Sequence, residues 1–244
     1  QGLFLVEGLR ECRRAMACGW AFEALFFAED LFPSPESSQW LQQLTAAGEV
    51  PFDCVPMTET VFRKVAYRQH PDGLLAILHK RAHSLPDLPR PDHPCYIVPV
   101  GIEKPGNLGA ILRTTDAAGA DACLLADARC DPYNPNAVRA SQGAFFHLPF
   151  VSASSADVLA FLQQRKLQPV LTSPSAEQSF FELDLRQPVA LVLGTESAGL
   201  PEAWLHAPGR RAALPMQGIT DSLNVSAMAA VALFETVRQR RQTK

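Results

Sequence analysis

Three short loops carry the residues of this sequence whose types could serve a reaction. The first loop runs from Gly101 to Gly109 and contains Asn107, and Arg113 follows it. Glycines allow close backbone approach, and the first turn of a helix binds anions through its free N–H groups. We expect Asn107 to cap a helix here or to bind an anion, although a simple capped turn explains the spacing equally well.

The second loop runs from Leu191 to Pro201, where an apolar run enters a turn that holds Glu196 between Gly194 and Gly199. Ligands of open α/β sheets bind beyond the carboxyl ends of the strands. A single glutamate in a loop is usually solvated, but this position at a strand end favours a binding role.

The third loop runs from Leu214 to Ser226. Asp221 or Ser222 can cap the helix that follows, while Asn224 directs its amide back toward the loop. Helix capping alone would explain these residues.

Alternating strand-like and helix-like runs must position the three loops. After residue 95, strand-like runs cover 96–100, 122–126, 169–172 and 189–193, and helix-like runs cover 108–118, 156–165 and 223–240. This alternation predicts an α/β domain with a mainly parallel sheet covered on both faces. Residues 1–83 show a shorter alternation and predict a small α/β domain. Four prolines predict a linker at 84–94, which leaves 95–244 as the second domain.

The composition limits the kinds of site. The 22 basic and 25 acidic residues give a net charge of −3, so sequence-independent binding to polyanions is not expected and RNA would need local patches. The six cysteines form no C-x-x-C pair, so we expect free thiols and no metal. No apolar run is long enough to span a membrane, and residues 1–8 do not resemble a secretory signal. We therefore expect a cytoplasmic protein, although its start at Gln1 rather than Met indicates that a preceding segment is missing.

Taken together and in order, the three loops resemble the signature motifs of the SpoU (TrmH-like) RNA 2′-O-ribose methyltransferases of the SPOUT superfamily. The resemblance covers about residues 96–241, and the segment 134–143, with Arg139 and Ser141, resembles the family's connecting segment. It implies a deep trefoil knot formed by the C-terminal loops, S-adenosylmethionine bound within the knot, and a homodimer whose active site draws on both subunits. The matched motif positions are Asn107, Arg113, Gly194, Glu196, Ser222, Leu223 and Asn224.

The resemblance also implies roles for individual residues. Arg113 would be the central catalytic residue, since a guanidinium suits stabilisation of a developing alkoxide, while the proton acceptor stays unassigned. Hydrogen bonds from four further catalytic residues would orient the reactants: Asn107, Glu196, Ser222 and Asn224. The cofactor would contact five residues: Thr172, Gly194, Leu214, Ile219 and Leu223.

The opening residues 4–8, followed by a helix, resemble the start of an L30e/L7Ae-like RNA substrate-binding domain. Arg63, Lys64 and Arg68 near Phe62 and Tyr67 could hold phosphates and stack on bases, although a solvated helix face over two core aromatics explains them as well. The resemblance adds Arg139 to these RNA-binding candidates. The basic end of the last helix could touch RNA or simply complement the helix dipole.

Other functions stay open at this point. A front domain of this kind favours 23S-type ribosomal RNA over tRNA as the substrate, by analogy alone. A tRNA 2′-O-methyltransferase and a non-catalytic RNA-binding or ribosome-assembly factor are the alternatives. A nucleotide-binding enzyme would need a phosphate loop or a Rossmann fingerprint, and the sequence contains neither.

Overall fold

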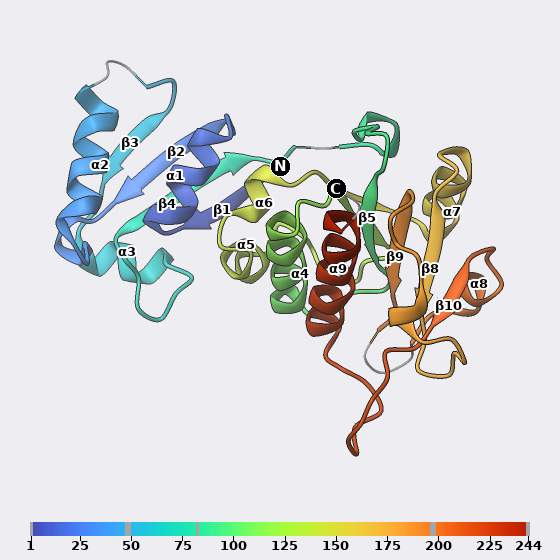
Figure 1. The fold of residues 1–244 in the computed structure, drawn as a ribbon. Helices are drawn as coiled ribbons and strands as arrows, with labels where there is room; N and C mark the ends of the chain where they lie inside the picture. The colour runs from blue at the N-terminus through green and yellow to red at the C-terminus, as the bar shows by residue number, and fades with distance from the viewer. Residues whose placement is uncertain (1, 47–49, 82, 196–198, 243–244) are drawn as a thin grey trace. The chain divides into compact units, whose positions relative to one another are not determined.

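The computed structural model describes residues 2–46, 50–81, 83–195 and 199–242. The chain divides into two compact units (Figure 1). The first contains residues 1–81 and 132–147, and the second contains residues 82–131 and 148–244. The chain therefore leaves the second unit after residue 131 and returns to it at residue 148.

The first unit is built on a four-stranded mixed sheet in the order β1-β4-β2-β3. β4 pairs antiparallel with β1 and β2, whereas β2 and β3 are parallel. The core of the unit contains Val6, Leu25 and Phe62, none of which is exposed. Its elements are β1 (Leu3–Glu7), α1 (Leu9–Ala17), β2 (Phe22–Phe27), η1 (Glu29–Leu31), α2 (Pro35–Ala46), β3 (Asp53–Pro56), α3 (Glu59–Val65), β4 (Leu74–His79), α5 (Pro135–Ala140) and α6 (Ala144–His147).

The segment 132–147 completes the core of the first unit. The indole of Trp20 donates a hydrogen bond to the backbone oxygen of Phe146 at 3.0 Å. Phe4 makes an edge contact with Tyr133 at 4.8 Å between ring centroids and packs against Phe145 at 5.7 Å. Aromatic pairs contribute stability beyond the area they bury. The first unit therefore depends on a segment that the sequence analysis assigned to the second domain.

The second unit contains a six-stranded sheet in the order β10-β8-β9-β5-β6-β7, in which every strand pair is parallel. β5, β6 and β9 are buried along their whole length, as expected of strands covered on both faces. The elements are η2 (Leu85–Asp87), β5 (Cys95–Pro99), α4 (Pro105–Ala117), β6 (Ala122–Ala126), β7 (Phe150–Ala153), α7 (Ser155–Gln164), β8 (Gln168–Thr172), η3 (Phe180–Glu182), β9 (Val189–Leu193), α8 (Glu202–Leu205), β10 (Arg210–Ala212) and α9 (Val225–Arg241).

Alternate residues of the buried strands face two different cores. Tyr96, Leu124 and Val192 belong to one core cluster together with Val158 and Phe161 of α7. The intervening strand residues point to the opposite face because side chains alternate along a strand. α4 and α9 lie side by side and contact the sheet through β6 and β9 (Figure 1).

The α/β class and the parallel sheet predicted from the sequence are confirmed. β1, β7 and β10 were not predicted as strands, nor α5 and α6 as helices. The trefoil knot stays a prediction, because the loops expected to form it include residues 196–198, outside the described part. All six cysteines are free, and burial raises the pKa of Cys95 to about 12.

Candidate active site

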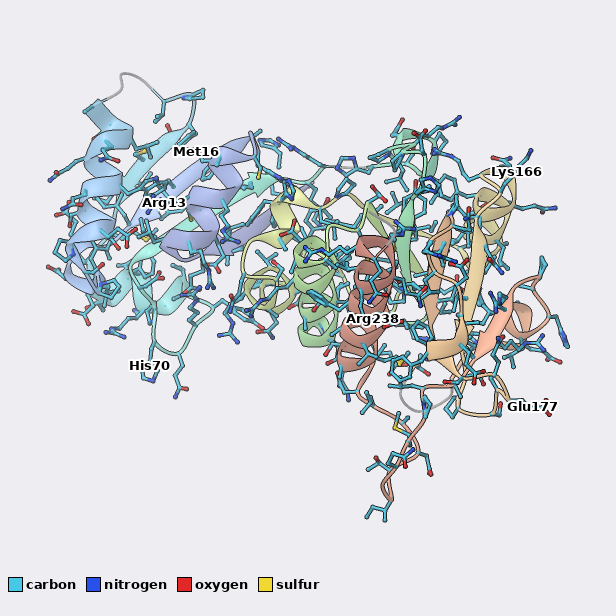
Figure 2. The ribbon with its side chains drawn as sticks, viewed as in Figure 1. Arg13, Met16, His70, Lys166, Glu177 and Arg238 are labelled. Atoms are coloured by element: carbon cyan, nitrogen blue, oxygen red, sulfur yellow. The ribbon has the colours of Figure 1, made fainter. Side chains whose placement is uncertain are left out.

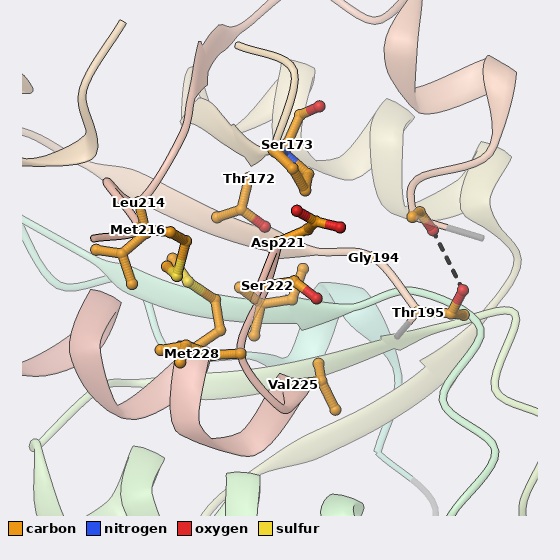
Figure 3. A pocket seen from close by; sticks show the side chains of 14 residues that line it. Thr172, Ser173, Gly194, Thr195, Leu214, Met216, Asp221, Ser222, Val225 and Met228 are labelled. Carbon is orange, nitrogen blue, oxygen red and sulfur yellow. Dashed lines mark hydrogen bonds between the residues drawn. The ribbon is translucent and has the colours of Figure 1, made fainter. Parts of the chain in front are cut away.

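The loops that follow three adjacent strands line a cavity of about 260 Å³ (Figure 3). Thr172 ends β8, Gly194 follows β9 and Leu214 follows β10, so the cavity lies at the carboxyl edge of the parallel sheet. Ligands of open α/β sheets bind at this edge. The full lining is Thr172, Ser173, Pro174, Leu193, Gly194, Thr195, Gly199, Leu214, Met216, Asp221, Ser222, Leu223, Val225 and Met228.

A second cavity, of about 170 Å³, lies at the end of β5 and is lined by residues 99–104 and by Asn107. It shares Gly194, Thr195 and Val225 with the first cavity. The two hollows therefore meet beside the β9 loop, where a ligand in the first cavity would be close to Asn107.

The β9 loop requires glycine at position 194. Backbone hydrogen bonds of 3.0 and 3.1 Å join Thr195 and Gly199 and bring Gly199 next to the end of β9. A Cβ atom added at Gly194 would lie 2.4 Å from the carbonyl carbon of Gly199, which is closer than real Cβ contacts. The glycine that the sequence analysis selected for the cofactor thus also allows the loop to close.

The first and third loops meet through two amides. The side-chain nitrogen of Asn224 donates to the side-chain oxygen of Asn107 at 3.4 Å. The oxygen of Asn224 accepts from the backbone N–H of Ser226 at 3.0 Å, so Asn224 is itself the N-cap of α9. The expectation that Asp221 or Ser222 caps this helix was wrong.

Asn107 does not cap α4. The N-cap residue of α4 is Lys104, which makes no side-chain capping bond, and Pro105 begins the helix. Asn107 therefore lies in the first turn of α4, and it lines the second cavity.

Arg113 lies on α4 but lines neither cavity. It follows Asn107 by six positions, and at 3.6 residues per turn this places the two side chains roughly 120° apart around the helix. Arg113 is exposed and makes no hydrogen bond or ion pair with any residue that the structure describes. One chain therefore does not bring this guanidinium to the cavities.

Four of the five expected cofactor residues line the first cavity: Thr172, Gly194, Leu214 and Leu223. Ile219 does not line it, and its side chain is fully exposed. Ser222 lines the cavity as well, whereas Glu196 lies outside the described residues. Ser173, Met216 and Met228 also line the cavity, and the sequence carried no signal for them.

Asp221 also lines the first cavity, although the sequence analysis considered it only as a helix cap. Its position directly before the Ser222-Leu223-Asn224 motif was the one signal that could have identified it.

The expected RNA-binding residues separate into two groups. Arg63 and Lys64 on α3 and Arg139 on α5 are exposed, and Arg63 pairs with the neighbouring Glu59 at 2.7 Å. Exposed pairs of this kind contribute little stability, so they leave the cation available.

Arg68 is different, because its side chain is only 18% exposed and its contacts are internal. It donates to the backbone oxygen of Glu7 at 2.7 Å and to Asp72 at 3.0 Å, and it lies 3.5 Å from Glu11. Burial raises the pKa of Glu7, an effect that hydrogen bonds from the backbone N–H groups of Arg68 and Tyr67 partly offset. Arg68 is thus part of the interior of the first unit rather than of an RNA-binding surface.

The described ranges contain neither a cluster of metal-ligand side chains nor a membrane-spanning helix. No group of three or more His, Cys, Asp or Glu side chains is arranged to hold a metal ion there. None of the helices in those ranges has the length and apolar character needed to cross a membrane.

Two parts of the chain each match a known protein family. Residues 94–234 match the SpoU rRNA methylase family, and residues 1–76 match an MRM3-like substrate-binding domain. The 23S rRNA (uridine(2479)-2′-O)-methyltransferase of Streptomyces viridochromogenes is 30% identical over 98% of this chain and 84% of its own length.

Solved structures give the same result. The crystal structure of an RNA 2′-O ribose methyltransferase is 41% identical, with a TM-score of 0.84, covering 99% of this chain and 90% of its own. The SpoU methyltransferase AviRb of Streptomyces viridochromogenes, in complex with AdoMet, is 30% identical, with a TM-score of 0.87, covering 98% of this chain and 91% of its own. The family model covers more than half of the chain and includes all three loops at the sheet edge, and the chain therefore belongs to the SpoU rRNA methylase family.

Proposed function

We propose that this chain methylates a ribose 2′-hydroxyl of large-subunit ribosomal RNA, using the cavity at the β8, β9 and β10 loops to hold its cofactor. As a SpoU methylase it is an RNA 2′-O-methyltransferase, and its cofactor is S-adenosylmethionine. The main observation in support of this site is that the first cavity meets the second cavity, which Asn107 lines, at Gly194. The relative that acts on 23S rRNA aligns along nearly the whole chain, which supports the choice of RNA.

The cavity suits the cofactor in its chemistry. Leu193, Leu214, Val225 and Met228 offer apolar surface for an adenine ring, and nearby hydroxyl groups offer hydrogen bonds to a ribose. When bound, S-adenosylmethionine supplies a methyl group on a positively charged sulfur. Glu196, which precedes Gly199 in the same loop, stays a proposed contact.

The second cavity is the proposed place for the target ribose. The hydrogen bond between Asn107 and Asn224 fixes two amides there, and Ser222 lies close by in the same loop as Asn224. Alignment of reacting groups can supply roughly 7–11 kcal/mol of a barrier, so positioning by such amides is a large part of the task.

Arg113 fits this scheme if the active enzyme is a homodimer in which each site receives Arg113 of the partner subunit. Its exposure and its distance around α4 from Asn107 support this arrangement. α9 also presents Phe234, which is 49% exposed, next to partly buried Ala230 and Val231, a surface suited to helix packing.

In the first unit we propose that Arg63, Lys64 and Arg139 bind RNA phosphates, and we leave Arg68 out. A ribosomal RNA substrate also supports the cytoplasm as the place of action.

The direct test uses methyl-labelled S-adenosylmethionine with unmodified ribosomal RNA and, separately, with tRNA. We expect label on a ribose 2′-oxygen of the large-subunit RNA and a loss of roughly 10²–10³-fold in rate for Arg113→Ala, comparable to the removal of one donor that stabilises a developing oxyanion. Arg186→Ala is the matched control, because Arg186 is exposed, lies outside both cavities and, among the described residues, pairs only with Asp184. Label confined to tRNA would overturn the substrate, and cofactor binding without label would favour the non-catalytic RNA-binding factor.

A mixing experiment tests the shared site. Arg113→Ala and Asn107→Ala subunits are each expected to be inactive, yet mixed dimers contain one site with both wild-type residues. Recovery of activity on mixing supports the shared site, and continued inactivity of mixed dimers would place Arg113 and Asn107 in the same subunit's site.

A further inference from the structure

We propose that Asp221 is the counter-charge for the cationic methionine half of S-adenosylmethionine, which gives the cavity its preference for a charged cofactor. The inference rests on the proposed assignment of the first cavity to the cofactor. Figure 3 shows the carboxylate of Asp221 among the side chains that line the cavity, in the neighbourhood of Thr172 and Ser173.

The charge of the lining is the first argument. Asp221 is the one ionisable side chain among the described residues that line the cavity, and the others are apolar, hydroxyl-bearing or glycine. S-adenosylmethionine carries a sulfonium and an ammonium group, whereas its adenosine half is neutral. A carboxylate in a partly enclosed site attracts a cation more strongly than it would in bulk water.

No other task occupies the Asp221 carboxylate among the residues that the structure describes. Asn224, and not Asp221, caps α9. Asp221 is exposed, and in the part of the chain that the structure describes no arginine, lysine or histidine pairs with it. A charged side chain that points into a ligand cavity without a protein partner is available to a ligand cation.

The test compares wild type with Asp221→Asn, which keeps the shape of the side chain and removes its charge. Binding is measured by calorimetry for S-adenosylmethionine and for 5′-methylthioadenosine, which retains the adenosine and the sulfur but has neither cation. We expect Asp221→Asn to raise the Kd of S-adenosylmethionine about tenfold. The Kd of methylthioadenosine should stay within about twofold of its wild-type value. Asp92→Asn, an exposed aspartate outside the cavity, controls for the change in net charge.

S-adenosylhomocysteine identifies which cation Asp221 faces, because it keeps the ammonium group and lacks the sulfonium charge. Unchanged binding of this compound by Asp221→Asn assigns the carboxylate to the sulfonium, and equal weakening assigns it to the ammonium group; both support the proposal. The proposal would be overturned if Asp221→Asn bound S-adenosylmethionine as tightly as wild type does, or if it bound methylthioadenosine more weakly by the same factor as S-adenosylmethionine. If the wild-type chain bound no S-adenosylmethionine, the cavity assignment itself would fail together with the proposal.

Discussion

Asn224 performs two tasks with one side chain, and substitutions can separate them. Its oxygen caps α9, and its nitrogen reaches Asn107 in the second cavity. Asp at this position keeps an acceptor for the cap but cannot donate to Asn107, whereas Ala removes both interactions.

We therefore expect the free energy of unfolding of Asn224→Asp, measured in urea, to lie within about 0.5 kcal/mol of the wild-type value. That of Asn224→Ala should be about 1 kcal/mol lower, the usual cost of a lost cap. Both variants should methylate RNA far more slowly. If Asn224→Asp kept full activity, the bond to Asn107 would not contribute to the reaction.

The sequence predicted which residues line the cavity where a motif lies next to a helix or strand. It did not predict them where the conformation of a loop decides which side chains face the cavity. Gly194 and Leu223 line the cavity as expected, because Gly194 directly follows β9 and Leu223 lies two residues before α9, and the apolar pattern predicts both elements. Ile219 lies in the middle of a loop without periodicity, so only the family resemblance selected it as a cofactor contact, and its side chain is fully exposed. Asp221, two residues later, faces the cavity instead.

At the scale of elements, a continuous apolar run that is buried on both faces of the sheet made a strand predictable. β5, β6 and β9 are buried runs of five residues each and were recognised. β10 has three residues, two of them arginine, and pairs only with β8, so its sequence has no strand pattern. Its pairing depends on tertiary contacts that local propensity does not report.

The C-terminal end of α9 carries basic side chains, among them Arg238, which Figure 2 labels, and Arg240, which contacts other segments of the second unit. Arg238, labelled there, pairs with Glu235 at 2.7 Å and lowers the pKa of that carboxyl group. Arg240 donates to the backbone oxygens of His93 at 2.7 Å and Gln187 at 3.0 Å, and also to those of Pro94 and Leu185. α9 thereby ties the start of β5 to the loop before β9.

We expect Arg240→Ala to lower the free energy of unfolding by roughly 2–3 kcal/mol, since charged hydrogen bonds contribute about 1.5–3 kcal/mol and several carbonyl groups would lose their partner. Arg241→Ala, at an exposed neighbouring position, should change it by less than about 0.5 kcal/mol. Urea unfolding measures both. A normal stability for Arg240→Ala, with a smaller salt dependence of RNA binding, would instead favour an RNA-contacting role.

At the scale of the whole molecule, the two compact units do not follow the linear order of the chain. The proline-rich segment at 84–94 suggested a division into 1–83 and 95–244, yet residues 132–147 pack in the first unit. The sequence could not show this, because the segment resembles the family's connecting motif and its partners, Phe4 and Trp20, are more than 100 residues away.

A fragment of residues 1–81 should therefore be less stable than the first unit of the intact chain. We expect Trp20, which is 6% exposed in the intact chain, to show red-shifted fluorescence in this fragment, with Trp40→Phe used to remove the other indole. Joining residues 132–147 to the fragment through a flexible linker should restore the blue-shifted emission. Equal emission and stability of the fragment with and without residues 132–147 would show that the segment is dispensable.

This arrangement has a consequence for synthesis on the ribosome. All four strands of the first sheet have been translated once residue 79 is complete, but Phe145 and Phe146, which close its aromatic cluster, follow more than 60 residues later. At roughly 5–20 residues per second, that interval lasts on the order of 3–13 s. During it, Phe4 and Trp20 lack their final partners on the nascent chain, so the N-terminal part of this protein is the stretch on which a holding chaperone would act.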